Sequence, residues 1–122
     1  MAETNPFIRY RERLDSYGRA RSAGWSDQRF VDLVSALNHE IRNVDGRGFY
    51  VTPTVDGSHL ATALGLDVNL NIKVEIDSVG GSHKARHLFG VALHLAIDEA
   101  DHPVSNRPLA IASCGNAAIA AA

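Results

Sequence analysis

The sequence is short of cysteine, since its 122 residues include only Cys114. One cysteine excludes an internal disulfide framework and a zinc site built from cysteines alone. Acidic and basic residues number 14 and 12, and a net charge of −2 argues against binding to nucleic acid or to an anionic membrane by charge alone. No apolar run approaches the roughly 20 residues of a membrane span, and the polar first ten residues show no secretory signal. We therefore expect a cytoplasmic enzyme or binding domain.

What is present suits a folded domain, with 45% apolar and 21% charged residues. The first part predicts two helices. One begins with Asn5 as N-cap and Pro6 and runs to about Gly24, and we interpret its arginines as a solvated face. The other begins after Ser26 and fades at Asn43. Its apolar stripe consists of Phe30, Leu33, Val34, Leu37 and Ile41.

Residues 1–48 are thus a predicted N-terminal helical extension, and residues 49–122 are the predicted start of an α/β domain. The expected elements are a helix over 58–64, a strand over 68–76, a helix over 83–100, a buried strand over 109–112 and a helix after 116. For the helix over 83–100, the core candidates are Leu88, Val91, Ala92, Leu95 and Ile97. Alternation of strands and helices predicts an α/β fold, with part of a parallel sheet flanked by helices.

The first junction that could carry chemistry is the loop from Gly80 to Arg86. Glycines let a backbone approach a ligand closely, and a following helix start offers free N–H groups. The positive potential there disfavours a charged ammonium on Lys84, and a neutral amine is what attacks an aldehyde. The alternative is a solvated surface lysine. The loop is not a Walker A motif, because Ser82 and His83 precede the lysine.

The second junction is Ser113, Cys114, Gly115 and Asn116, a turn of small residues that could seat a carboxylate or phosphate. Cys114 is either a nucleophile or a small buried side chain, and no partner base can be placed beside it. Among the six histidines, His83 and His87 would share a helix face. They lack the glutamate of a metalloprotease helix, so no metal site is expected.

Together the two junctions resemble those of the fold-type II pyridoxal-phosphate enzymes. These include threonine synthase, threonine and serine dehydratases, cysteine synthase and the tryptophan synthase β chain. The similarity consists of Lys-Val-Glu, then Gly-Gly-Ser-His-Lys-Ala-Arg before a helix, then Ser-Cys-Gly-Asn-Ala-Ala after an apolar run. It begins at Thr52-Pro53-Thr54, which is similar to an early Thr-Pro-Leu of the family. The opening over 5–10 resembles the N-terminal extension of threonine synthase-like members.

The resemblance implies that Lys84 forms a Schiff base with pyridoxal 5′-phosphate and later serves as acid and base at the substrate Cα. It implies that Asn116 hydrogen-bonds the 3′ oxygen of the cofactor and that His83 packs against the cofactor ring. The turn of Ser113, Cys114, Gly115 and Asn116 would hold the substrate carboxylate. Two departures stand out, Val-Gly-Gly-Ser in place of a Thr-Gly-Ser pattern, and Cys114 where many members carry serine. The second makes racemisation doubtful.

Two parts of the family's pattern are missing here, the glycine-rich phosphate loop and the partner of the pyridine nitrogen. The chain also stops in an uncapped apolar run over 117–122. We interpret it as an N-terminal fragment, inactive alone, of a homodimeric lyase or synthase. That enzyme would catalyse β- or γ-elimination or replacement on a small amino acid, and dehydratase-like and threonine synthase-like activities are not separated. The alternative is a non-catalytic α/β binding or regulatory module that retains the fold.

Overall fold

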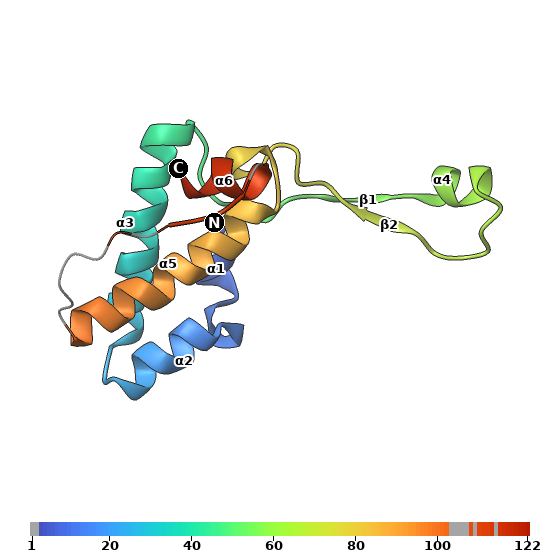
Figure 1. Cartoon of the computed structure of the whole chain (residues 1–122). Coiled ribbons are helices and arrows are strands. Elements are labelled where there is room, and N and C mark those ends of the chain that lie inside the picture. Colours follow the sequence, from blue (N-terminus) through green and yellow to red (C-terminus); the bar gives the residue numbers. More distant parts are fainter. Residues whose placement is uncertain (1–2, 103–107, 109, 114) are drawn as a thin grey trace.

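The computed structural model describes residues 3–102, 108, 110–113 and 115–122. They form a helical body from which a thin arm projects (Figure 1). Their elements, in chain order, are α1 (Pro6–Arg9), the 3₁₀ helix η1 (Arg11–Arg13), α2 (Asp15–Ser22), α3 (Asp27–Asp45), β1 (Thr54–Asp56), α4 (Ser58–Ala63), β2 (Asn71–Lys73), the 3₁₀ helix η2 (Val79–Gly81), α5 (Lys84–Asp101) and α6 (Asn116–Ala121).

The first predicted helix begins as expected but does not continue to Gly24. The Asn5 side chain accepts a hydrogen bond from the Phe7 N–H at 2.9 Å, which confirms the predicted N-cap. The helix breaks at Tyr10, between α1 and η1, and again at Leu14, which is extended, between η1 and α2. The break allows Arg11 to reach forward to Asp27, with 2.6 Å between Nε and Oδ1.

The second predicted helix is confirmed as α3. The Ser26 hydroxyl accepts a hydrogen bond from the Arg29 N–H at 3.1 Å, and the predicted stripe turns inward, with Phe30 and Val34 fully buried. The helix ends at Gly46, whose φ of 80° is the left-handed conformation of a helix C-terminus.

Most arginines of α2 and its neighbours bind within the chain, which favours a structural role for them. The contacts are Arg11 with Asp27, Arg19 with Asp98 at 2.6 Å, Arg21 with the Trp25 carbonyl, and the Arg29 guanidinium 3.7 Å from the centre of the Trp25 ring. A guanidinium over an indole ring is attracted by the negative face of the ring.

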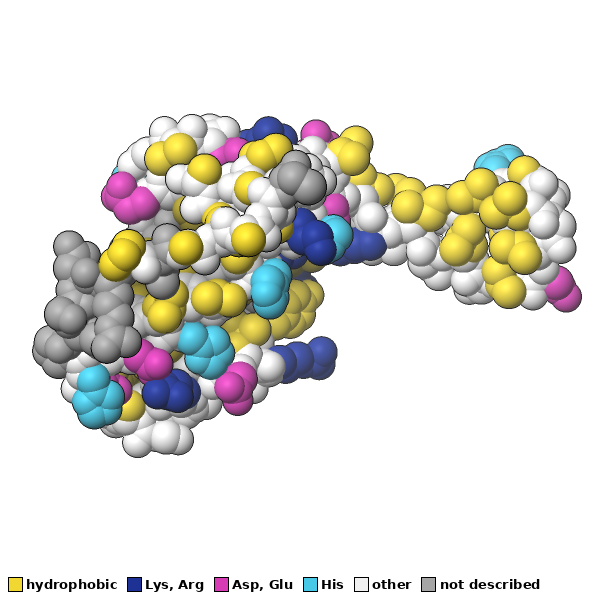
Figure 2. Space-filling model, viewed as in Figure 1, with side chains coloured by type: hydrophobic (Ala, Val, Ile, Leu, Met, Phe, Trp, Pro, Cys, Tyr) yellow, Lys and Arg dark blue, Asp and Glu magenta, His cyan; other side chains and the backbone are white. Residues whose placement is uncertain are grey.

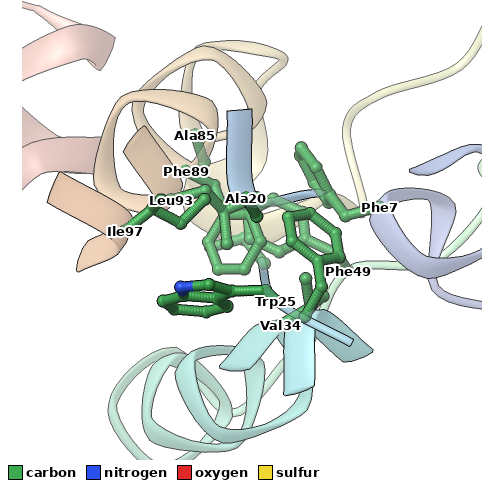
Figure 3. Close-up of a cluster of buried hydrophobic side chains, with 11 residues drawn as sticks. Phe7, Ala20, Trp25, Val34, Phe49, Ala85, Phe89, Leu93 and Ile97 are labelled. Atoms are coloured by element: carbon green, nitrogen blue, oxygen red, sulfur yellow. The ribbon is translucent and has the colours of Figure 1, made fainter. Parts of the chain in front are cut away.

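The core forms where α5 packs against the N-terminal helices. Phe89 of α5 lies 4.6 Å from Phe7 and 4.8 Å from Phe49, measured between ring centres (Figure 3). Ala85, Leu93 and Ile97 continue this buried face along α5. Tilted and edge-on aromatic contacts of this kind stabilise a core beyond the area that they bury.

The sequence assigned the wrong face of α5 to the core. Of the predicted core residues only Ile97 is fully buried, whereas Leu88, Val91, Ala92 and Leu95 line an open groove. The helix is apolar on both sides, and a periodic pattern does not say which side meets the rest of the chain. Here the Phe7 and Phe49 rings decide it.

The predicted parallel sheet is not formed by the described residues. The two strands are antiparallel, with Thr54 opposite Lys73 and Asp56 opposite Asn71. The connection between them contains only α4. It reverses the direction of the chain, so that β2 pairs antiparallel with β1, whereas a parallel pair needs a longer crossover connection. The predicted strand over 68–76 shrinks to β2, and the described part of the 109–112 run is irregular because no strand pairs with it there.

The arm carries the predicted short helix, α4, at its tip (Figure 1). The apolar side chains of the arm are largely open to solvent (Figure 2). They include Leu60, Leu64, Leu66 and Val68. The described helices include none with the length and apolar character that a membrane crossing demands.

Replacing Phe89 by alanine removes the ring that joins Phe7 to Phe49. We expect the free energy of unfolding to fall by about 3–5 kcal/mol, because a large buried side chain leaves a cavity. Urea unfolding measures this change. The control Val91→Ala changes a 41% exposed residue of the same helix, and its effect should stay within about 1 kcal/mol. Equal losses for the two variants would contradict the assignment of the inner face.

Candidate functional site

The loop before α5 contains two consecutive left-handed glycines. Gly80 has φ 64° and Gly81 has φ 66°, and the Gly81 N–H donates to the Ser78 carbonyl at 2.8 Å. Only glycine adopts this conformation routinely, so the Gly-Gly pair is required by the turn itself. Ser78 and Ser82 on either side are buried. The turn is therefore a fixed corner of the body and not a loose surface loop.

Lys84 is the first residue of α5 and is exposed. The chain has two lysines, and the other, Lys73, donates a hydrogen bond from its ammonium to the Thr52 carbonyl. Within the described ranges, the Lys84 ammonium makes no hydrogen bond or ion pair. His83 is also exposed, and its side chain makes no capping hydrogen bond to α5. Lys84 is thus the lysine amine available to a partner from outside the chain.

A network of hydrogen bonds holds the start of α5 to the exit of β2. Arg86 donates from Nε to the Glu75 carboxylate at 2.9 Å and from Nη2 to the Tyr50 carbonyl at 2.9 Å. The Thr52 hydroxyl donates to the other Glu75 oxygen at 2.6 Å. Both charged side chains are mostly shielded, with 23% of Arg86 and 17% of Glu75 exposed. The network brackets the glycine turn, since Glu75 precedes it and Arg86 follows it.

The same network sets the charge state of Glu75. Burial raises the pKa of this carboxyl, but the hydrogen bonds from Thr52 and Arg86 and the charges of Arg86 and Lys73 together hold it below the ordinary value of 4.5. Sequence analysis did not identify this pair. The signal that could have found it is an acidic residue just before the loop and a basic residue just after the loop.

The second predicted junction lies against the first through α6. This helix begins at Asn116, as expected, and packs on α5 and on η2 (Figure 1). A Cβ atom built on Gly80 would lie 3.8 Å from the Cβ of Ala120, so the glycine turn and α6 touch.

The side chains of this junction are open to solvent. Ser113, Gly115 and Asn116 are exposed, and the Gly115 N–H donates to the Ser113 hydroxyl at 3.4 Å. Cys114 lies outside the described residues. The described side chains of His83, Lys84 and Asn116 make no hydrogen bond to one another. The structure therefore brings together the elements that carry the predicted residues, but not their functional groups.

An apolar groove of about 720 Å³ runs beside this region, between α3, α5 and α6. Its walls include Val44, Leu88, Ala92 and Ile119. Neither Lys84 nor Asn116 lines it, and its only described ionisable side chains are Glu40 and Asp45. This groove is thus mainly apolar, and the predicted chemistry lies outside it.

The histidines form no evident metal site in the part of the chain that the structure describes, where no three His, Cys, Asp or Glu side chains are grouped to hold an ion. His83 and His87 both point to the exposed side of α5. No family model, no curated protein and no solved structure matches this chain. Lys84, the glycine turn and the contacts that hold them are therefore the features of the chain that bear on its function.

Replacing Glu75 by glutamine should destabilise the protein in a pH-dependent way. The charged carboxylate contributes stability above its ordinary pKa of 4.5, and this contribution is lost as pH falls through the lower pKa of the folded state. At pH 7 we expect E75Q to lose roughly 1–3 kcal/mol, the scale of hydrogen bonds to charged groups. Urea unfolding of both proteins from pH 7 to pH 3 measures the difference. A difference that does not shrink toward pH 3 would contradict this role.

Proposed function

We propose that this chain provides the reactive lysine of a cytoplasmic pyridoxal-phosphate-dependent lyase or synthase that acts on a small amino acid. The reaction is elimination or replacement at the β or γ carbon, and the working enzyme is a homodimer. The observation that carries the proposal is Lys84, which is exposed, follows two left-handed glycines and has an ammonium that makes no hydrogen bond or ion pair within the described ranges.

The residues around Lys84 fit such a cofactor. A primary amine is the group that condenses with an aldehyde, and Lys84 presents one at the start of an 18-residue helix. The glycine turn leaves open space at Gly81, where an added Cβ would have only the Ile76 carbonyl within 4 Å, at 3.9 Å. The positive end of the α5 helix dipole favours an anionic partner such as a phosphate ester.

The proposed roles are those that the resemblance implies for these residues. Lys84 would hold the cofactor through its amine and, once the amino group of the substrate has displaced it, would carry a proton to and from the substrate Cα. Asn116, at the start of α6, donates its amide to the 3′ oxygen of the cofactor, and His83 packs against the ring. Backbone N–H groups of 113–116 bind the substrate carboxylate. When bound, pyridoxal phosphate supplies an electron sink for the negative charge that develops at Cα.

The contact between Gly80 and Ala120 supports this arrangement, because it joins the glycine turn to the helix that begins at the second junction. The substrate would then meet Lys84 from one element and the carboxylate-binding turn from the other. In cofactor-dependent enzymes the protein mainly positions the substrate and the cofactor, and the cofactor supplies the chemistry of the bond changes.

Trapping with borohydride tests the proposal directly. We expect incubation with pyridoxal phosphate followed by reduction to give a stable adduct that peptide mass spectrometry places on Lys84. The variant Lys84→Ala should lose it, because no other lysine amine is available without breaking a contact. The control Lys73→Ala removes the second lysine and should keep the adduct on Lys84. An adduct on Lys73 alone, or none, would overturn the proposal and favour a non-catalytic binding module.

A further inference from the structure

We propose that Asp45 is a positioning residue that clamps the glycine turn and thereby fixes where Lys84 leaves the body. Asp45 is the last residue of α3, and its Oδ1 accepts a hydrogen bond from the Gly80 N–H at 3.1 Å. This inference rests on the proposed function, because it concerns the same lysine. It adds a residue 39 positions before Lys84 that no motif includes.

The bond between Asp45 and Gly80 is shielded and directional. Only 23% of the Asp45 side chain is exposed, and its second oxygen lies 3.3 Å from the Arg47 Nε. That oxygen is buried and makes no hydrogen bond within the described chain, so Arg47 acts on it by charge. A carboxylate that accepts a backbone N–H makes a stronger bond than a neutral acceptor does.

The place of Asp45 on its helix argues for a specific role. The C-terminus of a helix carries a partial negative charge, which disfavours an acidic side chain in the last turn. Asp45 occupies that turn, directly before the Gly46 cap. Considered with α3 alone, Asp45→Ala would therefore stabilise the helix. The Asp45 carboxylate can stabilise the protein only through its contacts outside α3. Within the described residues, these contacts are with Gly80 and Arg47.

The clamp matters because it ties the backbone of the glycine turn to the end of α3. Two glycines leave the backbone wide conformational freedom, so external bonds must select one conformation. Asp45 holds the entry of the turn through Gly80, and the Glu75–Arg86 pair holds its exit two residues after Lys84. Without the Asp45 bond, the turn keeps the buried Val79, the Ala120 contact and the Glu75–Arg86 pair, but it loses its side-chain hydrogen bond to the end of α3.

The test compares Asp45→Ala with Asp45→Asn and with the control Arg47→Ala. The asparagine amide oxygen accepts the same hydrogen bond, whereas alanine accepts none. The control removes the other partner of Asp45 and leaves the Gly80 contact in place. Amide hydrogen exchange of residues 78–83, measured without cofactor, reports on the clamp. Borohydride trapping of pyridoxal phosphate on Lys84 reports on the position of the lysine.

We expect exchange at Gly80 to accelerate about tenfold in D45A, which matches the loss of one hydrogen bond. The trapped fraction on Lys84 should fall several-fold in D45A, and both readouts should return toward wild type in D45N and stay near it in R47A. Unchanged exchange in D45A overturns the clamp. Faster exchange with undiminished trapping overturns the positioning role. If the wild-type protein traps no pyridoxal phosphate, the proposed function and the role of Lys84 in it are overturned, whatever the amide hydrogen exchange shows.

Discussion

The packing of Phe89 against Phe7 and Phe49 is the contact on which the rest of the structure depends. The three rings come from three separate segments, and each buries on the order of 150–250 Å². Together they fix the rotation of α5 about its axis. Once Phe89 faces inward, Ala85 faces inward too, and Lys84, one residue earlier, emerges at the surface. The exposure of the candidate lysine is therefore a consequence of aromatic packing five residues away.

Charged groups then refine what the apolar core has placed. The Glu75–Arg86 pair joins the exit of β2 to the first turn of α5, and Asp45 joins the end of α3 to the glycine turn. Each bond links segments that are distant in sequence and is largely withdrawn from water, where a polar group needs its partner. Lys84 lies between these two sets of bonds, and they define its position. The side chains of His83, Lys84 and Asn116 make no hydrogen bonds to one another within the described chain.

The open apolar surfaces of the molecule explain where sequence patterns misled. The outer face of α5 lines a groove with Val44 and Ile119, and the arm exposes Leu60 and Leu64. Apolar periodicity therefore marked both faces of α5 and could not choose between them. A similar problem affected the strands, since the alternation over 68–76 is real but only 71–73 found a partner, and that partner was the antiparallel segment 54–56. Strand pairing depends on a second segment that no local pattern specifies.

The sequence by itself determined the features that are made within a few residues: the Asn5 and Ser26 caps, the glycine turn before α5 and, to within one residue, where α5 and α6 begin. Caps and turns are settled by hydrogen bonds and backbone sterics between near neighbours, which adjacent letters of the sequence specify. Only the tertiary structure decided which face of α5 is buried, how β1 and β2 pair and that Asp45 reaches Gly80. Those outcomes depend on side chains that lie tens of residues apart, and their energies exist only once the chain has folded.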